Sequence, residues 1–326
     1  MKKILDRFNE LNVAVLGDVM LDIFTYGISE RLSPEAPVPV IRIHKKEYCA
    51  GGAGNVAENL ASLDVKCTLF GLIGSDYNGK KLAESISTAN IASRLIEDAS
   101  RPTTVKERFV ANHQQLLRVD AEETSVCTAE LQQLFFDELS SLIKNKKIDA
   151  LIFSDYKKGV LSTTLVQKLI DCANENQIVT ALDPKPGSLD VVKNLTILKP
   201  NRTEAFALAG MKDDLFADSV TRRELLLNAA EKIYQKYTPE YLVISLSADG
   251  LAIYGNGSLN IIPTAAKEVF DVSGAGDTLI ASMTCAVASG GDIMSAAKIG
   301  NIASGIAVGK RGTSCVSRSE ILDCKA

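Results

Sequence analysis

Short apolar runs alternate along the chain with segments of helical periodicity. The apolar runs are bounded by turn residues and predict strands at 13–18, 67–74, 150–155, 178–183, 195–201 and 241–247. Between them, apolar residues recur every three or four positions, which predicts helices at 54–63, 78–87, 162–176 and 222–237. This succession is typical of βαβ units. We therefore expect an α/β fold with a mostly parallel central sheet that is sandwiched by helices.

Two stretches alternate polar and apolar residues without a following helix, VPVIRIHKKEY (38–48) and TVKERFVANHQQLLRVDAEE (104–123). Strands that leave a parallel sheet and keep one polar face predict a small antiparallel β lid beside it. No internal repeat or low-complexity linker divides the chain. We expect one domain over residues 1–326, with lid strands inserted at about 19–48 and 104–122.

Composition excludes several classes of partner. The net charge is −4 and no long basic run occurs, so we expect neither nucleic acid nor a membrane as partner. No signal-peptide pattern and no run of about 18 apolar residues is present, which predicts a cytoplasmic protein. The seven cysteines are scattered without a Cys-x-x-Cys pair and only two histidines exist, which argues against disulfides and a zinc site.

Two glycine-rich stretches imitate nucleotide motifs. GSDYNGKK (74–81) has the Gly-x4-Gly-Lys spacing of a P-loop, but Lys81 stands where Ser or Thr must ligate magnesium. We expect a plain strand-to-helix turn there. GGAGNVA (51–57) contains Gly-x-Gly-x-x-Ala, but a polar segment precedes it instead of a buried strand. Its glycines instead predict backbone amides that approach a polar ligand at a helix N-terminus, with Asn55 to grip it.

The stretch DVSGAGDTLIASM (271–283) predicts an anion site. Gly274, Ala275 and Gly276 precede a helix whose first N–H groups have no partner within the helix, so a phosphate or oxyanion would be stabilised there. Asp277 then has two interpretations. It is either an ordinary acidic residue that favours the first helical turn, or a general base that takes a hydroxyl proton beside a bound phosphoryl group.

Four ordered motifs resemble the ribokinase-type (PfkB) sugar kinases: a first strand that ends in Gly-Asp, GGAGN, LKPNRTE, and GAGD preceded by Asp-x-Ser. The likeness spans nearly the whole chain and implies a ribokinase-like fold and an enzyme that uses ATP and Mg²⁺. It makes Asp277 the base, and Gly274, Ala275 and Gly276 the anion hole for the γ-phosphoryl group.

Within the family, segments 17–43, 112–120 and 154–161 resemble kinases of D-glycero-β-D-manno-heptose 7-phosphate. These make the 1,7-bisphosphate for ADP-heptose and lipopolysaccharide synthesis. Some carry a fused nucleotidyltransferase, but this chain has no His-x-Gly-His, so we expect the stand-alone kinase.

The resemblance assigns further site residues. The predicted sugar-phosphate contacts are Asp18, Asp22, Gly51, Gly52, Asn55, Arg108, Arg118, Asp155, Lys157 and Lys158. The predicted nucleotide contacts are Lys199, Asn201, Ser245, Ser247, Gly250 and Asn301. Asn201 and Glu204 are expected to organise magnesium through water, because Mg²⁺ keeps several waters and needs few carboxylates besides phosphates.

Alternatives remain for these residues. Asn201 and Glu204 also fit an ordinary helix cap, Asp18 a turn cap, and Asp22 and the basic residues a solvated surface. The enzyme could instead phosphorylate fructose 1-phosphate, a hexose or ribose, because a fold does not fix its substrate. A sensor without turnover is a further alternative. The lid's apolar face and its likeness to lids of related kinases suggest a homodimer formed through it.

Overall fold

The computed structural model describes residues 1–86, 90–112, 114–214, 216–255, 257–310, 312 and 314–324. Ser87, at the end of the predicted helix 78–87, and His113 in the second lid segment lie outside the described residues.

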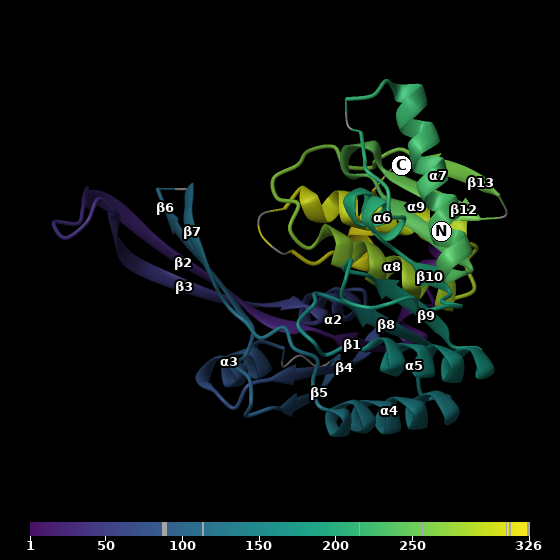
Figure 1. Cartoon of the computed structure of the whole chain (residues 1–326), viewed down its shortest axis with the longest axis horizontal. Coiled ribbons are helices and arrows are strands. Elements are labelled where there is room, and N and C mark those ends of the chain that lie inside the picture. Colours follow the sequence, from purple (N-terminus) through teal and green to yellow (C-terminus); the bar gives the residue numbers. More distant parts are fainter. Residues whose placement is uncertain are drawn as a thin grey trace.

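A large sheet forms the body of the molecule (Figure 1). In spatial order its strands are β13 (Ser258–Ile262), β12 (Leu251–Gly255), β11 (Tyr241–Ser245), β10 (Ile197–Leu198), β9 (Val179–Asp183), β8 (Ala150–Ser154), β1 (Asn12–Gly17), β4 (Lys66–Ile73) and β5 (Ile91–Glu97). From β11 to β5 every pair is parallel, whereas β12 and β13 pair antiparallel at one edge. The mostly parallel sheet expected from the sequence is therefore present.

Helices cover both faces of this sheet over two apolar cores. The helices are α1 (Lys2–Leu5), α2 (Ala53–Ser62), α3 (Tyr77–Ser85), α4 (Ala129–Lys144), α5 (Thr163–Glu175), α6 (Arg202–Leu208), α7 (Ser219–Tyr237), α8 (Ala275–Ala288), α9 (Ile293–Val308) and α10 (Arg318–Asp323), with short 3-10 turns η1 (Phe8–Glu10) and η2 (Ser247–Asp249). Strand β1 contributes side chains to both cores, because successive residues of a strand point to opposite faces of the sheet. Val13 and Val15 pack toward α2, α8 and α9, whereas Ala14 and Leu16 pack toward α4 to α7. Burial on both faces explains the continuous apolar runs.

A four-stranded lid projects from the body (Figure 1). It comprises β3 (Pro39–Gly52), β2 (Val19–Leu32), β6 (Val105–Ala111) and β7 (Gln114–Ala121), in this spatial order. The hairpins β2–β3 and β6–β7 are antiparallel as expected, but the central pair β2–β6 is parallel. The lid is therefore a mixed sheet, a correction to the expected antiparallel one. The reason is that both hairpins leave the body in the same direction.

The carboxyl ends of three central strands bring functional side chains together. Gly17, Ser154 and Asp183 are in register at the ends of β1, β8 and β9. The residues that follow these strands therefore meet at one edge of the sheet, beside the lid strand β2, which begins at Val19. Ligands of open α/β sheets bind at this edge.

Candidate functional site

Asp277 is the centre of a buried polar cluster. It lies in the first turn of α8 and is 3% exposed. Asn55 Nδ2 of α2 donates a hydrogen bond to Asp277 Oδ2 at 2.6 Å, and the Tyr156 hydroxyl donates to Oδ1 at 2.9 Å. Both carboxylate oxygens are thus oriented by neutral donors from other elements.

The electrostatic environment raises the pKa of Asp277 to about 6, mainly through burial. The negative charge of Asp183 adds to the increase, whereas the hydrogen bonds from Asn55 and Tyr156 and the charge of Lys199 oppose it. A carboxylate whose pKa lies just below neutral pH is suited to accept a proton. This environment is compatible with the base interpretation of Asp277, which stays a prediction.

The N-terminus of α8 has no side-chain cap. Gly274 is the N-cap at φ 79°, a left-handed conformation that favours glycine, and it supplies no side-chain cap. The N–H group of Ala275 makes a 3.3 Å bond to the Val272 carbonyl, so the groups best placed for an external anion are those of Gly276 and Asp277. A side chain at Gly276 would lie 3.3 Å from Lys199 Nζ, because an ion pair lies against this residue.

Asn55 contacts the predicted base and is part of a chain of buried amides. Its backbone carbonyl and Oδ1 accept from Asn59 Nδ2 at 2.8 and 3.3 Å. Asn59 Oδ1 in turn accepts from the Thr278 hydroxyl at 2.8 Å. This network joins α2 to the first turn of α8 and leaves Asn55 Nδ2 engaged with Asp277, a contact that the sequence did not predict.

Tyr156 is a site residue that sequence reasoning missed. It follows β8 in SDYKKG, and besides the bond to Asp277 its ring has Lys106 Nζ of the lid 5.5 Å and Lys185 Nζ 5.6 Å from its centroid. Lys106 was also missed. Tyr156 stands in a segment quoted for its family likeness and Lys106 in the alternating stretch 104–123, but no spacing rule links either residue to Asp277.

Asp18 and Asp155 hold a loop. Asp18 is 1% exposed, and its carboxylate accepts the backbone N–H groups of Tyr156, Lys158 and Val160 at 2.8 to 3.1 Å. Asp155 is also buried and accepts from the backbone of Lys157 and Lys185 and from the Ser188 hydroxyl; burial raises its pKa to about 6. Both carboxylates accept hydrogen bonds from loop residues near the site and so fix the conformation of these loops. Direct contacts of Asp18 and Asp155 with the sugar stay predictions.

Asp22 lies on lid strand β2, next to the GGAGN turn. Its Oδ2 occupies the space where a side chain on Gly51 would stand, and its Oδ1 accepts from Arg108. Gly52 has φ 59°, and a Cβ there would overlap the Asp18 carbonyl oxygen, so this turn requires glycine. The glycines therefore allow β3 to approach these two acids closely.

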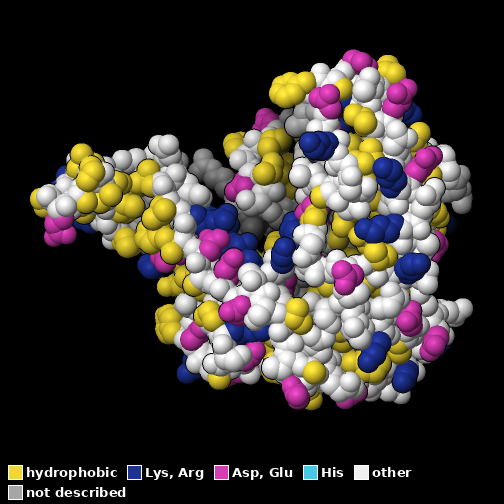
Figure 2. Space-filling view, viewed as in Figure 1, with side chains coloured by type: hydrophobic (Ala, Val, Ile, Leu, Met, Phe, Trp, Pro, Cys, Tyr) yellow, Lys and Arg dark blue, Asp and Glu magenta, His cyan; other side chains and the backbone are white. Residues whose placement is uncertain are grey.

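Basic side chains gather between lid and body. Figure 2 shows Lys and Arg in the hollow beside the lid. Arg108 is paired with Asp22, Arg118 with Asp120, and Lys158 with Glu122. Lys157 is exposed, with φ 58°. The predicted cations thus lie on the lid and on the adjoining loop, together with the half-buried Lys106.

Asn201 and Glu204 form the helix cap that the sequence left open. Asn201 Oδ1 accepts the Glu204 N–H group at 2.9 Å, and Glu204 Oε2 accepts the Asn201 N–H group at 2.8 Å. Glu204 Oε1 also accepts from Lys185. Asn201 Oδ1 and both carboxylate oxygens of Glu204 each accept one hydrogen bond and keep a second lone pair. These oxygens could therefore accept hydrogen bonds from the water ligands of a hydrated magnesium ion. Within the described ranges no group of three His, Cys, Asp or Glu side chains could bind a metal directly.

Lys199 is 2% exposed and is paired with Asp183 at 2.8 Å, beside the N-terminus of α8. This places a cation behind the predicted anion hole.

The remaining predicted nucleotide residues lie in the C-terminal part of the chain, at the end of β11, at η2 and on α9. Ser245 pairs with Asn201 through an isolated bridge, which joins the end of β11 to the start of α6. Gly250 has φ 92° and no room for a side chain against the Ile262 carbonyl. Asn301 Nδ2 of α9 donates to the Pro263 carbonyl at 2.7 Å, and Ser247 begins η2. The structure thus connects Gly250 and Asn301 through the segment after β13.

The P-loop-like segment 74–81 has a side chain of the protein itself at its helix N-terminus. The Asp76 carboxylate caps α3 by accepting the Gly79 N–H group at 2.7 Å and also accepts from Thr103. An acid therefore occupies the place where a P-loop binds phosphate, in agreement with the expected plain turn.

The model of the family described as pfkB family carbohydrate kinase matches residues 10–319. Bifunctional protein HldE of Pelobacter propionicus is 37% identical over 327 residues, which is 100% of this chain and 65% of the relative. HldE proteins of Geobacter sulfurreducens and Helicobacter pylori (strain HPAG1) are each 38% identical, over 96% and 95% of this chain and 62% and 65% of their own lengths. The chain thus spans less than two thirds of these curated relatives.

Solved structures share the architecture. Phosphofructokinase-2 from Escherichia coli in complex with potassium has a TM-score of 0.74 at 18% identity, covering 96% of this chain and 97% of that one. Arabidopsis thaliana ribokinase complexed with ribose and ATP has a TM-score of 0.69 at 19% identity, covering 96% and 98%. At these identities the likeness shows the fold. Within the described residues no helix is long and apolar enough to cross a membrane.

Proposed function

Because the chain belongs to the pfkB family of carbohydrate kinases, we propose that it transfers the γ-phosphoryl group of ATP to the C1 hydroxyl of D-glycero-β-D-manno-heptose 7-phosphate. The sugar kinase class and the ribokinase-like α/β fold follow from the comparisons above. The choice of sugar rests on the likeness of segments 17–43, 112–120 and 154–161 to heptose-phosphate kinases. The product would be the 1,7-bisphosphate used for ADP-heptose and lipopolysaccharide.

The observation that carries the proposal is the buried Asp277 at an uncapped helix N-terminus. Its carboxylate, held by Asn55 and Tyr156, takes the C1 hydroxyl proton as the oxygen attacks the γ-phosphorus. The N–H groups of Gly276 and Asp277 lie next to this carboxylate and stabilise the transferring phosphoryl oxygens, with Lys199 behind them. Catalysis then needs positioning and charge neutralisation rather than a covalent intermediate.

Magnesium would be held by Asn201 and Glu204 through water and by the ATP phosphates. When bound, it neutralises charge on those phosphates. The adjacent Ser245, Ser247, Gly250 and Asn301 would border the nucleotide.

The 7-phosphate would be bound by the basic residues of the lid and its adjoining loop. Arg108, Arg118, Lys106 and Lys158 provide cations there, and Asp22 provides an acceptor for sugar hydroxyls. The ion pairs of these cations would exchange their carboxylates for phosphate oxygens on binding, since charge-assisted contacts to phosphate are of comparable strength.

A coupled ADP-release assay with ATP and Mg²⁺ tests the function on β-heptose 7-phosphate, fructose 1-phosphate, fructose 6-phosphate and ribose. We expect turnover on the heptose phosphate alone, and its loss in Asp277→Asn. Turnover on another sugar would reject the substrate and keep the base. Full activity of Asp277→Asn would reject the mechanism.

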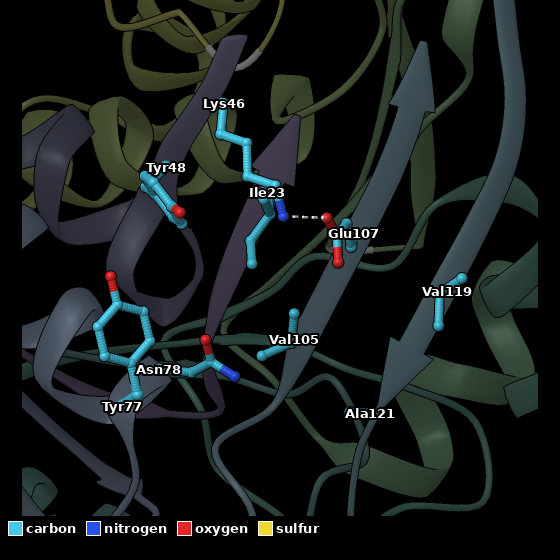
Figure 3. Close-up of a pocket in the computed structure, with 9 residues that line it drawn as sticks. All are labelled: Ile23, Lys46, Tyr48, Tyr77, Asn78, Val105, Glu107, Val119 and Ala121. Carbon is cyan, nitrogen blue, oxygen red and sulfur yellow. Dashed lines mark hydrogen bonds and ion pairs between the residues drawn. The ribbon is translucent and has the colours of Figure 1, made fainter. Parts of the chain in front are cut away.

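Apolar side chains on the lid strands support a homodimer formed through the lid. A cavity of about 250 Å³ is lined by apolar Ile23, Val105 and Val119, with the Lys46–Glu107 ion pair at its side (Figure 3). Leu117 and Val119 are about half exposed, and a second molecule that packs on these strands would bury them.

Light scattering of the protein should give twice the chain mass. Val119→Asp should give the monomer mass, and a monomeric wild type would reject the dimer.

A further inference from the structure

Tyr156 joins the lid, the body and the centre of the site. Its hydroxyl donates to Asp277 Oδ1 at 2.9 Å, while Lys106 Nζ of β6 and Lys185 Nζ from the loop after β9 lie over its ring. Its backbone is fixed as well, because the Tyr156 N–H group donates to Asp18 at 2.8 Å. The residue as a whole is partly exposed to solvent.

We propose that Tyr156 is a positioning residue for the reaction, whose hydroxyl orients the Asp277 carboxylate and stabilises its ionised form. The proposal rests on the role of Asp277 as base. The Tyr156 hydroxyl engages Oδ1 and Asn55 engages Oδ2, so rotation of the carboxylate would break two hydrogen bonds. Removal of one donor frees the carboxylate to rotate.

The hydroxyl acts as donor throughout. Burial and the negative charges of Asp277 and Asp183 hold the pKa of Tyr156 well above its usual value, so its proton stays on the phenol oxygen at working pH. A hydrogen bond to a carboxylate favours the charged form. Loss of this bond therefore raises the pKa of Asp277 above about 6.

Other charges face this pair from each packed element. Asp183 at the end of β9 raises the pKa of Asp277, and Lys199 after β10 lowers it. Cys315 near the C-terminus interacts with Asp277, and Asp22 of the lid interacts with Tyr156. Lys106 and Lys185 lie over the ring. Tyr156→Phe changes none of these groups, so a shift in the titration of Asp277 reports the lost hydroxyl.

The test compares wild type with Tyr156→Phe in the ADP-release assay with heptose 7-phosphate between pH 5 and 9. We expect kcat to fall about tenfold at pH 6 with a change in KM below about twofold, and the acid limb of kcat to move up by about one pH unit. Ionisation of the sugar phosphate affects both proteins equally. Tyr234→Phe is the matched control, since it removes a hydroxyl from α7 while its ring keeps the edge contact with Tyr254.

A second readout needs no substrate. Wild-type and variant proteins labelled with ¹³C in aspartate carboxyl groups are titrated by NMR, and Asp277→Asn identifies the Asp277 resonance. We expect its midpoint to move up by about one unit in Tyr156→Phe and to stay in place in Tyr234→Phe. An unchanged midpoint and an unchanged acid limb would overturn the proposal, even if kcat fell. Failure of the base assignment appears separately, as activity that survives Asp277→Asn, and failure of the proposed substrate appears as no ADP release by the wild type with heptose 7-phosphate.

Discussion

Arg108 of β6 and Arg118 of β7 lie directly opposite each other in the register of the lid. Like charges at opposed positions of an antiparallel pair destabilise a sheet. Each guanidinium is balanced by a separate carboxylate, Asp22 for Arg108 and Asp120 for Arg118. Two positions along the register, on the same face of the lid, Lys106 lies opposite Asp120 and adds another cation on the same strand as Arg108. A doubly charged phosphate would relieve this repulsion, which is why we assign the sugar phosphate to this part of the lid.

Arg118→Gln tests that assignment. We expect KM for the sugar phosphate to rise by about tenfold to a hundredfold with little change in kcat, because a charge-assisted contact far from the reacting oxygen is lost. KM for ATP should stay constant. Arg42→Gln is the matched control, since Arg42 is an exposed lid arginine in a 3.8 Å ion pair with Glu30. Equal effects of the two substitutions would contradict a phosphate site at Arg118.

Asp18→Ala tests whether Asp18 shapes the loop. Three backbone N–H groups would lose their buried acceptor, so we expect the free energy of unfolding to fall by about 3 kcal/mol in the absence of ligand. Denaturant unfolding measures this change. Asp137→Ala on the outside of α4 should have little effect, because its carboxylate accepts from the exposed Gln133. A variant with normal stability and a raised sugar KM would instead favour direct sugar binding by Asp18.

Local signals in the sequence predicted the fold and the start of α8, whereas the role of Asp277 as base came from the family resemblance and stays a prediction. Apolar runs located the central strands because both faces of a parallel sheet are buried, and GAGD located the start of α8. The parallel β2–β6 pairing was beyond such signals, because a strand's pattern records which faces are buried and not the direction of its neighbour. The Tyr156–Asp277 contact joins residues 121 positions apart, and only the fold brings them together. The capping motif of Asn201 and Glu204 was visible in the sequence and is present, whereas their magnesium role came from the family resemblance alone and stays a prediction.

Asp277→Asn should increase stability in a pH-dependent manner. Folding raises the pKa of Asp277 from 3.8 to about 6. At pH values between these two, the carboxyl group is therefore protonated to a larger extent in the folded state than in the unfolded state. The stabilising effect of protonation is therefore lost as pH rises through about 6. We expect the neutral amide, which can still bond to Asn55 and Tyr156, to raise the free energy of unfolding by about 2 kcal/mol at pH 8.

The difference between Asp277→Asn and wild type should shrink toward pH 4, where the wild-type carboxyl is neutral as well. Urea unfolding at pH 4, 6 and 8 checks this trend, and Asp137→Asn serves as the exposed control. A gain in stability that is constant with pH would show that desolvation of the Asp277 charge is not its cause.

Glu204→Gln separates magnesium binding from helix capping. Glutamine at this position can still accept the Asn201 N–H group, so α6 should keep its cap and the melting temperature should change little. The substitution removes the charge that would attract a hydrated ion and that balances Lys185. We therefore expect the Mg²⁺ concentration for half-maximal activity to rise several-fold at fixed ATP, with activity recovered at high Mg²⁺. Glu320→Gln is the control, because Glu320 forms the same kind of capping box in α10 with Ser317, far along the chain. An unchanged Mg²⁺ dependence would leave Glu204 as the cap of α6 and as the partner of Lys185 alone.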